Sequence, residues 1–200
     1  MSKAPKIGII SKLILSEYGE ILQALDINFI KALEILGFKS EVLAYFNSTL
    51  QGLDALIISG GNDLNSVSQS KINALRDRFE FSCIKKALEL NIPILGICKG
   101  AQSLACELNA QILPCKNHIG EHEIIWQDGK ILKVNSYHNY SINAPINADI
   151  LAMANDESIE AFINKDKKLL GAMWHFEREQ DLNNLSEASK RIFDIFKGLI

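Results

Sequence analysis

Proline, blocks of like charge and long apolar runs are all scarce in this sequence. Only four of its 200 residues are proline, while 48% are hydrophobic and 22% are charged. A chain of this length and composition is typical of one globular domain with a sizeable core. We therefore expect residues 1–200 to form a single domain without linkers, internal repeats or low-complexity tracts.

Neither sign of charge is in large excess. Lys and Arg number 21 against 24 Asp and Glu, so attraction to nucleic acid or to an anionic membrane has little support. The longest apolar runs, ALII and IPILGIC, are far too short to span a bilayer. Lys12 interrupts the apolar part of the opening segment, which therefore does not resemble a signal peptide. These absences favour a soluble protein with a small-molecule partner.

The four cysteines also lack the spacings of a disulfide framework. Cys83, Cys98, Cys106 and Cys115 include no C-x-x-C pair. Free thiols in a reducing compartment are the ordinary interpretation of such a pattern, so we expect a cytoplasmic location. One of the four, Cys98, needs a separate explanation because of the residues around it.

The first half of the sequence contains alternating strand and helix patterns. Apolar runs predict strands at 6–10, 39–46, 53–61 and 92–97, and helical spacing of apolar residues predicts helices at 20–36 and 71–90. Gly37 follows the first of these helices, as a C-terminal glycine commonly does. Such alternation predicts a mostly parallel sheet with helices on both faces.

Between residues 111 and 175 the helical period disappears. The short apolar runs HEIIW, KILKVN, IEAFIN and LLGAMW are separated by turn signals such as Asp128-Gly129. We expect further strands here, some of them antiparallel, followed by an amphipathic helix over 185–199. The fold class is therefore α/β, and ligands of such folds bind beyond the carboxyl ends of the strands.

The segment Gly96-Ile97-Cys98-Lys99-Gly100 lies at such a strand end. It has the spacing of a nucleophile elbow, in which a strand turns sharply into a helix and the central residue has a strained backbone. Side chains two residues before and after that residue would collide, which explains both glycines. The following helix would direct its N-terminal N–H groups at the sulfur and favour thiolate over thiol. The alternative is that Cys98 is an inert core residue at a tight turn.

The catalytic interpretation requires a base, and His175 can provide one. It stands at the end of an apolar run, and Glu177 follows two residues later. At a strand end this H-x-E spacing lets the carboxylate orient the imidazole while the other ring nitrogen faces a thiolate. That is the logic of a catalytic triad, and it counts against a non-enzymatic protein with a sensor cysteine.

Together these motifs resemble the class I glutamine amidotransferase family. The matching segments SGGND, GICKGAQ and MWHFE stand in the family's order and extend over nearly the whole chain. The resemblance implies a three-layer α/β/α, flavodoxin-like fold with a mostly parallel central sheet and additional antiparallel strands in the second half. The site residues that it implies are the triad Cys98, His175 and Glu177, the oxyanion-hole backbone N–H groups of Gly61 and Lys99, and the substrate contacts Gly60 and Gln102.

Within this family, two segments resemble the branch of free-standing γ-glutamyl hydrolases. LRDRFE, residues 75–80, resembles that branch's R-D-x-x-E, and VNSYHNY, residues 134–140, resembles its N-S-x-H-x-Q, with Tyr140 in place of the usual glutamine. A simple surface loop is the alternative interpretation of the second segment. The contacts with the glutamyl part of the substrate that this resemblance implies are Ser136, Tyr137 and His138.

Other charged residues have competing interpretations. Arg76 and Glu80 are spaced as an i,i+4 pair, and we expect a solvated ion pair on a helix face rather than a substrate contact. His118 and His122, beside Cys115, could be metal ligands, but no compact second pair of ligands accompanies them. We favour a place on the rim of the pocket for these histidines and expect no metal.

The resemblance implies acyl transfer without a metal or organic cofactor. Cys98 would attack the γ-carbonyl of a γ-glutamyl amide, His175 would protonate the leaving nitrogen, and water would release glutamate. The implied leaving group is linked to a nucleotide. A γ-glutamyl-γ-aminobutyrate-type hydrolase and a glutaminase subunit that supplies ammonia to a separate synthase are the alternatives. The candidate contacts for a diphosphate are Lys12, Lys116, His118 and His122.

Overall fold

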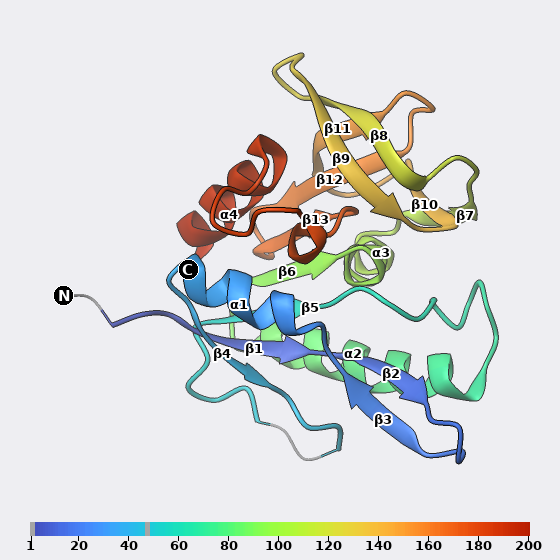
Figure 1. The fold of residues 1–200 in the computed structure, drawn as a ribbon, viewed down its shortest axis with the longest axis vertical. Helices are drawn as coiled ribbons and strands as arrows, with labels where there is room; N and C mark the ends of the chain where they lie inside the picture. The colour runs from blue at the N-terminus through green and yellow to red at the C-terminus, as the bar shows by residue number, and fades with distance from the viewer. Residues whose placement is uncertain (1–2, 47–48) are drawn as a thin grey trace.

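The computed structural model describes residues 3–46 and 49–200 of the chain. Among these residues, eleven strands form one mixed sheet and two more form a separate hairpin (Figure 1). The strand order of the sheet is β4-β1-β5-β6-β13-β12-β11-β8-β9, and β10 pairs with both β12 and β7. The expected α/β class is confirmed, with parallel strands in the first part of the sheet and antiparallel strands in the second.

The parallel part of the sheet contains the strands expected from the first half of the sequence. In sheet order they are β4 (Lys39–Val42), β1 (Lys6–Ile10), β5 (Ala55–Ile58) and β6 (Ile94–Ile97), followed by β13 (Leu169–Ala172) from near the carboxyl end. Every residue of β5, β6 and β13 is buried. Continuous apolar strands of this kind are typical of a parallel sheet covered on both faces.

The antiparallel part is built from the second half of the sequence and lies above the parallel part in Figure 1. Its strands are β12 (Ile159–Asn164), β11 (Asp149–Ala154), β8 (Ile119–Trp126) and β9 (Ile131–Tyr137), with β10 (Tyr140–Asn143) and β7 (Gln111–Pro114) beside them. Their pairings with one another, and that of β12 with β13, are antiparallel. The apolar runs expected to be strands are therefore confirmed, while β7, β10 and β11 have no counterpart among the predicted strands.

Helices cover both faces of the sheet, which gives three layers. On one face, α1 (Ile27–Ile35) and α4 (Glu187–Leu199) contribute Phe29 and Phe193 to a core with Ile9. On the other face, α2 (Lys71–Glu89) and α3 (Lys99–Glu107) contribute Ile84 and Leu104 to a core with Ile58. The helices expected at 71–90 and 185–199 are thus confirmed.

The helix expected over residues 20–36 is wrong in its first part. Residues Ile21–Ala24 form β3, which pairs with β2 (Lys12–Leu15), and α1 begins only at Ile27. Asp26 has an extended backbone, and its Oδ1 accepts a hydrogen bond from the N–H of Asn28 at 2.9 Å. An N-cap of this kind sets the start of a helix, whereas the apolar spacing continues across it.

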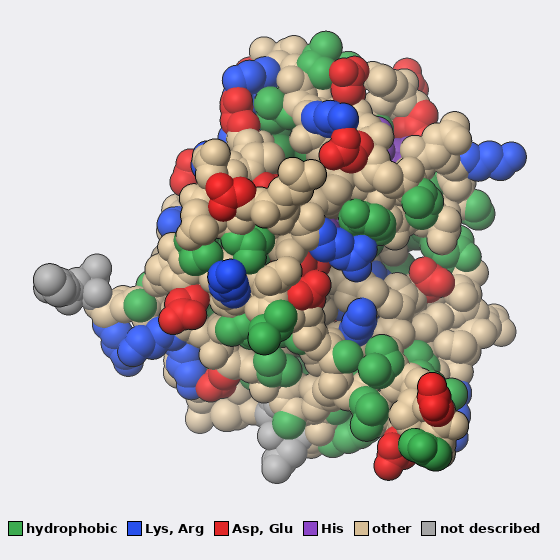
Figure 2. All heavy atoms as spheres, in the orientation of Figure 1, with side chains coloured by type: hydrophobic (Ala, Val, Ile, Leu, Met, Phe, Trp, Pro, Cys, Tyr) green, Lys and Arg blue, Asp and Glu red, His purple; other side chains and the backbone are tan. Residues whose placement is uncertain are grey.

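The surface carries both signs of charge. On the face drawn in Figure 2, basic and acidic side chains are interspersed, in agreement with the near balance of 21 Lys and Arg against 24 Asp and Glu. Within 3–46 and 49–200, the helices are too short or too polar for any of them to cross a lipid bilayer.

Candidate active site

Cys98 occupies the bend between β6 and α3. Its φ and ψ angles are 51° and −107°, in the left-handed region that side chains other than glycine rarely adopt. A Cβ on Gly96 would lie 2.5 Å from the carbonyl carbon of Gly100, and a Cβ on Gly100 would lie 2.3 Å from the carbonyl oxygen of Ile58. The strained bend is therefore observed, and a side chain at either glycine would collide with the backbone, as expected.

His175 lies at the adjacent strand end. It follows β13, which pairs in parallel with β6 so that Ala172 is opposite Ile97, and the N–H of Cys98 donates to the carbonyl of Ala172 at 2.8 Å. A Cβ on Gly60 would lie 2.4 Å from Cε1 of His175 and 3.3 Å from Cβ of Cys98. The structure thus brings Gly60, Cys98 and His175 together at the carboxyl ends of the strands.

The imidazole of His175 is held from two sides. Its Nδ1 lies 2.6 Å from Oε1 of Glu177, and both side chains are buried. Asn135 accepts a hydrogen bond from the backbone N–H of His175 at 2.9 Å and donates one to its carbonyl at 2.8 Å. Burial lowers the pKa of His175, but hydrogen bonds with Cys98 and Glu177 outweigh it and raise the pKa to about 9. The histidine is therefore protonated at neutral pH.

Arg76 and Glu80 form a buried ion pair, so the expectation of a solvated pair is wrong. Nε of Arg76 lies 3.0 Å from Oε2 of Glu80, and both side chains are 0% exposed. The same guanidinium donates hydrogen bonds to the carbonyl oxygens of Ser59, Gly60 and Gly61. Arg76 therefore fixes the loop after β5, where the predicted oxyanion-hole glycine lies.

Lys99 joins this ion pair from the elbow. Its Nζ lies 2.8 Å from Oδ1 of Asp77 and 2.8 Å from Oε1 of Glu80. Burial raises the pKa of Glu80, but the charges of Lys99 and Arg76 outweigh it, so the pKa lies below its usual value. Because α2 supplies Asp77 and Glu80, one helix holds both the residue after Cys98 and the glycine loop.

Gln102, a predicted substrate contact, has its side chain engaged in the protein. It is buried, and its Nε2 donates to the carbonyl of Tyr140 at 2.9 Å. The hydroxyl of Tyr140 in turn donates to the carbonyl of Val67 at 3.3 Å. In this arrangement Gln102 ties α3 to β10, and its place at the substrate stays a prediction.

The three predicted contacts on the edge of β9 point in different directions. The ring of Tyr137 lies 5.7 Å from that of His175 and is partly exposed. Ser136 is buried and donates to the carbonyl of His118 at 2.6 Å, and His138 is buried on the same side. Of these three side chains, the structure therefore places only Tyr137 beside His175.

A small hollow leads to the imidazole. It is lined by residues that include Lys12, Gly61, His175 and Arg178. The guanidinium of Arg178 lies 4.4 Å above the ring of Tyr137. The lining therefore contains two cations, one of them predicted from the sequence and one not, together with the carboxylates of Asp26 and Glu177.

The other three candidate diphosphate contacts lie elsewhere. Lys116, His118 and His122 line a different hollow, which they share with the carboxylates of Glu123 and Asp156. The hollow beside His175 also contains two carboxylates, those of Asp26 and Glu177, so carboxylates do not separate the two hollows and these three contacts stay a prediction. Of the four predicted contacts, only Lys12 lines the hollow beside His175.

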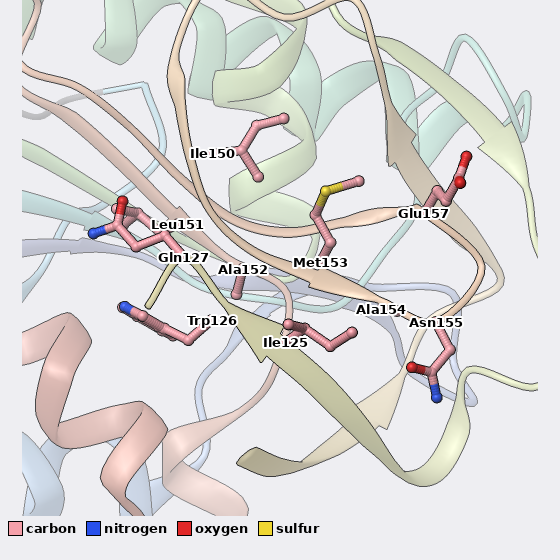
Figure 3. A pocket seen from close by; sticks show the side chains of 10 residues that line it. All are labelled: Ile125, Trp126, Gln127, Ile150, Leu151, Ala152, Met153, Ala154, Asn155 and Glu157. Atoms are coloured by element: carbon pink, nitrogen blue, oxygen red, sulfur yellow. The ribbon is translucent and has the colours of Figure 1, made fainter. Parts of the chain in front are cut away.

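A hollow larger than the one beside His175 lies away from the thiol. It has a volume of about 550 Å³ and lies over β8 and β11, where its lining includes Ile125, Trp126 and Met153 (Figure 3). None of Cys98, His175 and Glu177 lines it. Pocket size alone would therefore direct attention away from the residues that can do chemistry.

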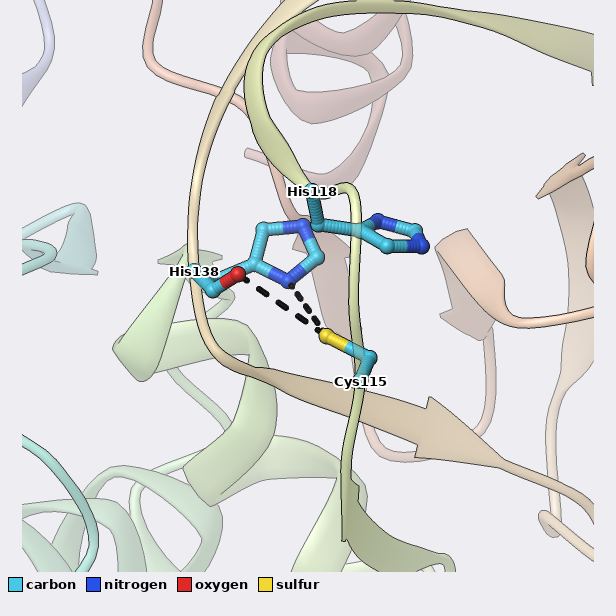
Figure 4. Close-up of side chains that lie close together, drawn as sticks. All are labelled: Cys115, His118 and His138. Atoms are coloured by element: carbon cyan, nitrogen blue, oxygen red, sulfur yellow. Dashed lines mark hydrogen bonds between the residues drawn. The ribbon is translucent and has the colours of Figure 1, made fainter.

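A second cluster of cysteine and histidine lies near β8. Sγ of Cys115 is 3.7 Å from Nδ1 of His138, with His118 beside them (Figure 4). Burial raises the pKa of the Cys115 thiol to about 11, and the charges of Asp156 and Glu160 add to the effect. Cys115 is therefore a neutral thiol near pH 7 and a poor nucleophile, unlike a cysteine at a helix N-terminus.

The fold agrees with the family comparison. The sequence model of the family Glutamine amidotransferase class-I matches residues 22–190. The chain therefore belongs to the class I glutamine amidotransferase family, and it is an amidohydrolase of that type.

Among its relatives is the γ-glutamyl-CDP-amidate hydrolase of Campylobacter jejuni, which is 43% identical over 147 residues covering 72% of each chain. A crystal structure assigned to a GMP synthase component from Thermoplasma acidophilum superposes with a TM-score of 0.75 at 22% identity, covering 100% of this chain and 95% of that one. A glutamine amidotransferase of Thermotoga maritima gives a TM-score of 0.67 at 19% identity, covering 98% and 94%. These two structural matches establish the fold alone.

Proposed function

We propose that the protein hydrolyses a γ-glutamyl amide bond with Cys98 as nucleophile, His175 as general acid and base, and Glu177 as the group that orients the imidazole. The observation that carries this proposal is the meeting of Cys98 and His175 at neighbouring strand ends, with Glu177 2.6 Å from the far ring nitrogen. A nucleophile, a base and an orienting carboxylate in this order are the minimum apparatus of acyl transfer.

In the first half-reaction the sulfur of Cys98 attacks the γ-carbonyl carbon. The negative charge that develops on the carbonyl oxygen is stabilised by the backbone N–H groups of Gly61 and Lys99, which belong to the loop and the helix start that Arg76 and Glu80 hold. His175 donates its proton to the leaving nitrogen, and the carbon–nitrogen bond breaks. A thioester to Cys98 remains.

In the second half-reaction water attacks the thioester. His175, now neutral, takes a proton from the water, and the sulfur leaves as glutamate forms. Glu177 keeps Nδ1 of the imidazole occupied, so that Nε2 serves both proton transfers. Gly60 and Gln102 flank the acyl group in this proposal, because Gly60 contacts both reacting residues and Gln102 lies in the first turn of α3.

We propose γ-glutamyl-CDP-amidate as the substrate, with cytidine diphosphoramidate as the second product. The relative that is 43% identical carries this activity in its name. Lys12 and Arg178 line the hollow beside His175 together with Asp26 and Glu177, and the ring of Tyr137 is partly exposed next to Arg178. The two cations can bind a diphosphate, so Arg178 is a further candidate for phosphate contact beside those predicted from the sequence.

The deciding experiment compares kcat/KM of the purified protein for γ-glutamyl-CDP-amidate, γ-glutamyl-γ-aminobutyrate and glutamine, with no other protein present. We expect the nucleotide substrate to be preferred by at least about 100-fold, the equivalent of roughly 2.7 kcal/mol of transition-state stabilisation. Lys12→Ala and Arg178→Ala should raise KM for that substrate and leave γ-glutamyl-γ-aminobutyrate hydrolysis unchanged.

Either of two other results would indicate a different substrate. Equal or faster turnover of γ-glutamyl-γ-aminobutyrate would assign the protein to the corresponding hydrolases. Release of ammonia from glutamine only after a synthase is added would make it a glutaminase subunit. The Cys98 mechanism would survive either result, because the three substrates share the γ-glutamyl carbonyl.

A further inference from the structure

Four side chains that the proposed reaction does not use converge in the antiparallel half of the sheet. Glu160 of β12 lies at their centre, with His118 and His122 from the start of β8 and His138 from the connection between β9 and β10 around it. Glu160 is 1% exposed, and His118 and His138 are also buried. Figure 4 shows His118 and His138 close together beside Cys115.

The polar atoms of this cluster form no hydrogen bonds, although the three histidines lie within ion-pair distance of Glu160. Nδ1 of His118, Nε2 of His122 and Nε2 of His138 form no hydrogen bond, and neither do the two carboxylate oxygens of Glu160. Leaving several buried polar atoms of one site unpaired is costly, and an ionised carboxylate this deep needs a countercharge. These nitrogens of His118, His122 and His138 lie around the carboxylate of Glu160.

Contacts with Glu160 and Asp156 raise the pKa of His118 to about 9, so this histidine supplies one countercharge, but a second protonated histidine is unfavourable here. The ring of His118 lies 4.7 Å from that of His122 and 4.7 Å from that of His138, so more than one imidazolium would face another at close range. Like charges at such separations repel strongly when they are buried. A single divalent cation would satisfy the three nitrogens and the carboxylate together.

The distances from the histidine nitrogens to the carboxylate of Glu160 are close to those between zinc ligands. Zinc binds imidazole nitrogen and carboxylate oxygen at about 2.0–2.1 Å, so neighbouring ligand atoms in a tetrahedral site lie about 3.3–3.4 Å apart. Nδ1 of His118 and Nε2 of His138 lie 3.3 and 3.6 Å from Oε1 of Glu160, and Nε2 of His122 lies 3.5 Å from Oε2. The ligand atoms of His118, His122 and Glu160 are also all within 4.8 Å of one another.

In two of the histidines, the ring nitrogen that faces away from Glu160 already contacts another group, which orients the ring. Nε2 of His118 lies 2.9 Å from Oδ2 of Asp156, and Nδ1 of His138 lies 3.1 Å from the carbonyl of Tyr140. A metal-binding histidine characteristically gives its other ring nitrogen to a carboxylate or a backbone carbonyl, which fixes the tautomer and the ring orientation. Each of these contacts leaves the inner nitrogen of the ring to face Glu160.

We propose that His118, His122 and Glu160 bind one divalent transition-metal ion of the zinc type, with the neighbouring His138 as the candidate fourth ligand. Imidazole and carboxylate suit such an ion, and a site closed by four protein ligands is structural rather than catalytic. Cys115 is not a ligand in this arrangement, because its sulfur lies next to Nδ1 of His138, the nitrogen that faces away from Glu160.

The metal would tie the start of β8 and the end of β9 to β12. His138 follows directly after Tyr137, whose ring lies 5.7 Å from that of His175. Fixing His138 therefore fixes the strand end that carries Tyr137 at the mouth of the active site. This role is independent of which γ-glutamyl amide is the substrate.

The test uses the Cys98→Ser protein, so that the active-site thiol cannot take up metal. After removal of metals with a chelator, the full chain is titrated with Zn²⁺ by calorimetry and with Co²⁺ by absorption spectroscopy. We expect one ion per chain, a higher Tm in the presence of Zn²⁺, and the intense visible bands of tetrahedral Co²⁺. Failure of the intact chain to bind one equivalent of either ion would overturn the proposal without recourse to a variant.

Variants then identify the ligands. His122→Ala and Glu160→Gln should each weaken Zn²⁺ binding by at least about 100-fold, whereas Cys115→Ala, which changes a neighbour of His138, should bind as before. Loss of binding in Cys115→Ala with retention in His122→Ala would place the ion between Cys115, His118 and His138 instead, and would refute this ligand set.

Discussion

At the scale of single residues, Cys98 is distinguished from the other thiols by its backbone and its neighbours. Cys83 is as buried as Cys98, so exposure does not separate them. Burial raises the pKa of Cys83, Cys106 and Cys115 to about 11, and each is therefore a neutral thiol near pH 7. Only Cys98 combines a helix N-terminus with an adjacent imidazole.

We predict that Cys98→Ala lowers turnover by about 10⁴-fold or more while the fold persists, because it removes the nucleophile. One equivalent of an alkylating agent at pH 7.5 should label Cys98 before the other thiols, as read by peptide mass spectrometry. The matched controls are Cys83→Ala, Cys106→Ala and Cys115→Ala, which should keep most of the activity. A Cys98→Ala protein with a comparable rate would refute the mechanism.

The pKa of His175 predicts an alkaline limit to activity. Because the pKa is raised to about 9, the proton donor to the leaving group is present below that pH and is lost as the pH rises through about 9. A folded-state pKa above the ordinary value of 6.5 also adds stability that is complete below about pH 6.5 and disappears as the pH rises through about 9. The measurements are kcat/KM against pH, and urea unfolding from pH 6 to 10.

Glu177→Gln should move this limit to lower pH, since Glu177 is one of the groups that raise the pKa. If Glu177 only orients the imidazole, this variant should also lose less activity than His175→Ala. The reverse ranking of the two losses would mean that the roles are misassigned.

Local spacing explains which site residues are predictable. Cys98 and the pair His175 and Glu177 lie in short motifs whose chemistry depends on neighbours within a few positions. The prediction for Arg76 is wrong because its partners, the carbonyls of the glycine loop, are distant in the sequence. Asn135, which holds the backbone of His175, is not predicted although it lies within the VNSYHNY segment, since no local pattern marks a side chain that bonds to a remote backbone.

At the scale of elements, the turn from β6 to α3 permits no side chains at its glycines. We predict that Gly100→Ala costs at least about 2 kcal/mol of unfolding free energy, because its Cβ would lie 2.3 Å from the carbonyl oxygen of Ile58 and the backbone would have to move. Urea denaturation measures the loss. Gly198→Ala in α4 is the control: no atom lies within 4 Å of its Cβ, and alanine favours a helix, so stability should stay the same or rise.

The buried charges on α2 make a second prediction at this scale. Arg76→Ala leaves Glu80 with one fewer cation in a fully buried position, so we expect a loss of about 3–5 kcal/mol in unfolding free energy. Arg191→Ala also removes an i,i+4 ion pair, with Glu187, but on the surface of α4, and it should cost much less. Equal losses from the two variants would mean that the buried network does not stabilise the fold.

The elements themselves are predictable where periodicity and caps agree. α2 is expected over 71–90 and is observed over Lys71–Glu89, with Ser70 accepting a hydrogen bond from the N–H of Asn73. Around α1 the apolar spacing continues through a strand that pairs only with β2, so the pattern does not reveal the break at Asp26. Ile21 and Leu22 of β3 are exposed, so in this segment the apolar spacing reports neither a helix nor burial.

At the scale of the whole molecule, the single domain stays a prediction, and unfolding tests it. Trp126 of β8 and Trp174 after β13 report on one core, while the buried apolar residues of α2 and α3 belong to the other. We expect urea unfolding followed by tryptophan fluorescence and by far-ultraviolet circular dichroism to give one coincident transition. Separate midpoints would show that the antiparallel half unfolds on its own.

The layered architecture follows from the alternation of strands and helices, but the order of strands in the antiparallel half does not. His118 and His122 have the residue type of metal ligands, yet their own segment offers no second pair. That pair, His138 and Glu160, is supplied by other parts of the sheet. Only the pairing of β8, β11 and β12 brings these residues together, and no local spacing encodes it.

The backbone hydrogen bond from Cys98 to Ala172 has a consequence for divergence within the family. It joins the ends of two adjacent strands, yet the chain between them runs through β7 to β12. Loops in that intervening segment can lengthen, shorten or change composition. The distance between the thiol and the imidazole stays the same, because the sheet fixes it. A lineage with this topology can therefore exchange one leaving group for another in small steps and inherit the same bond-breaking chemistry throughout.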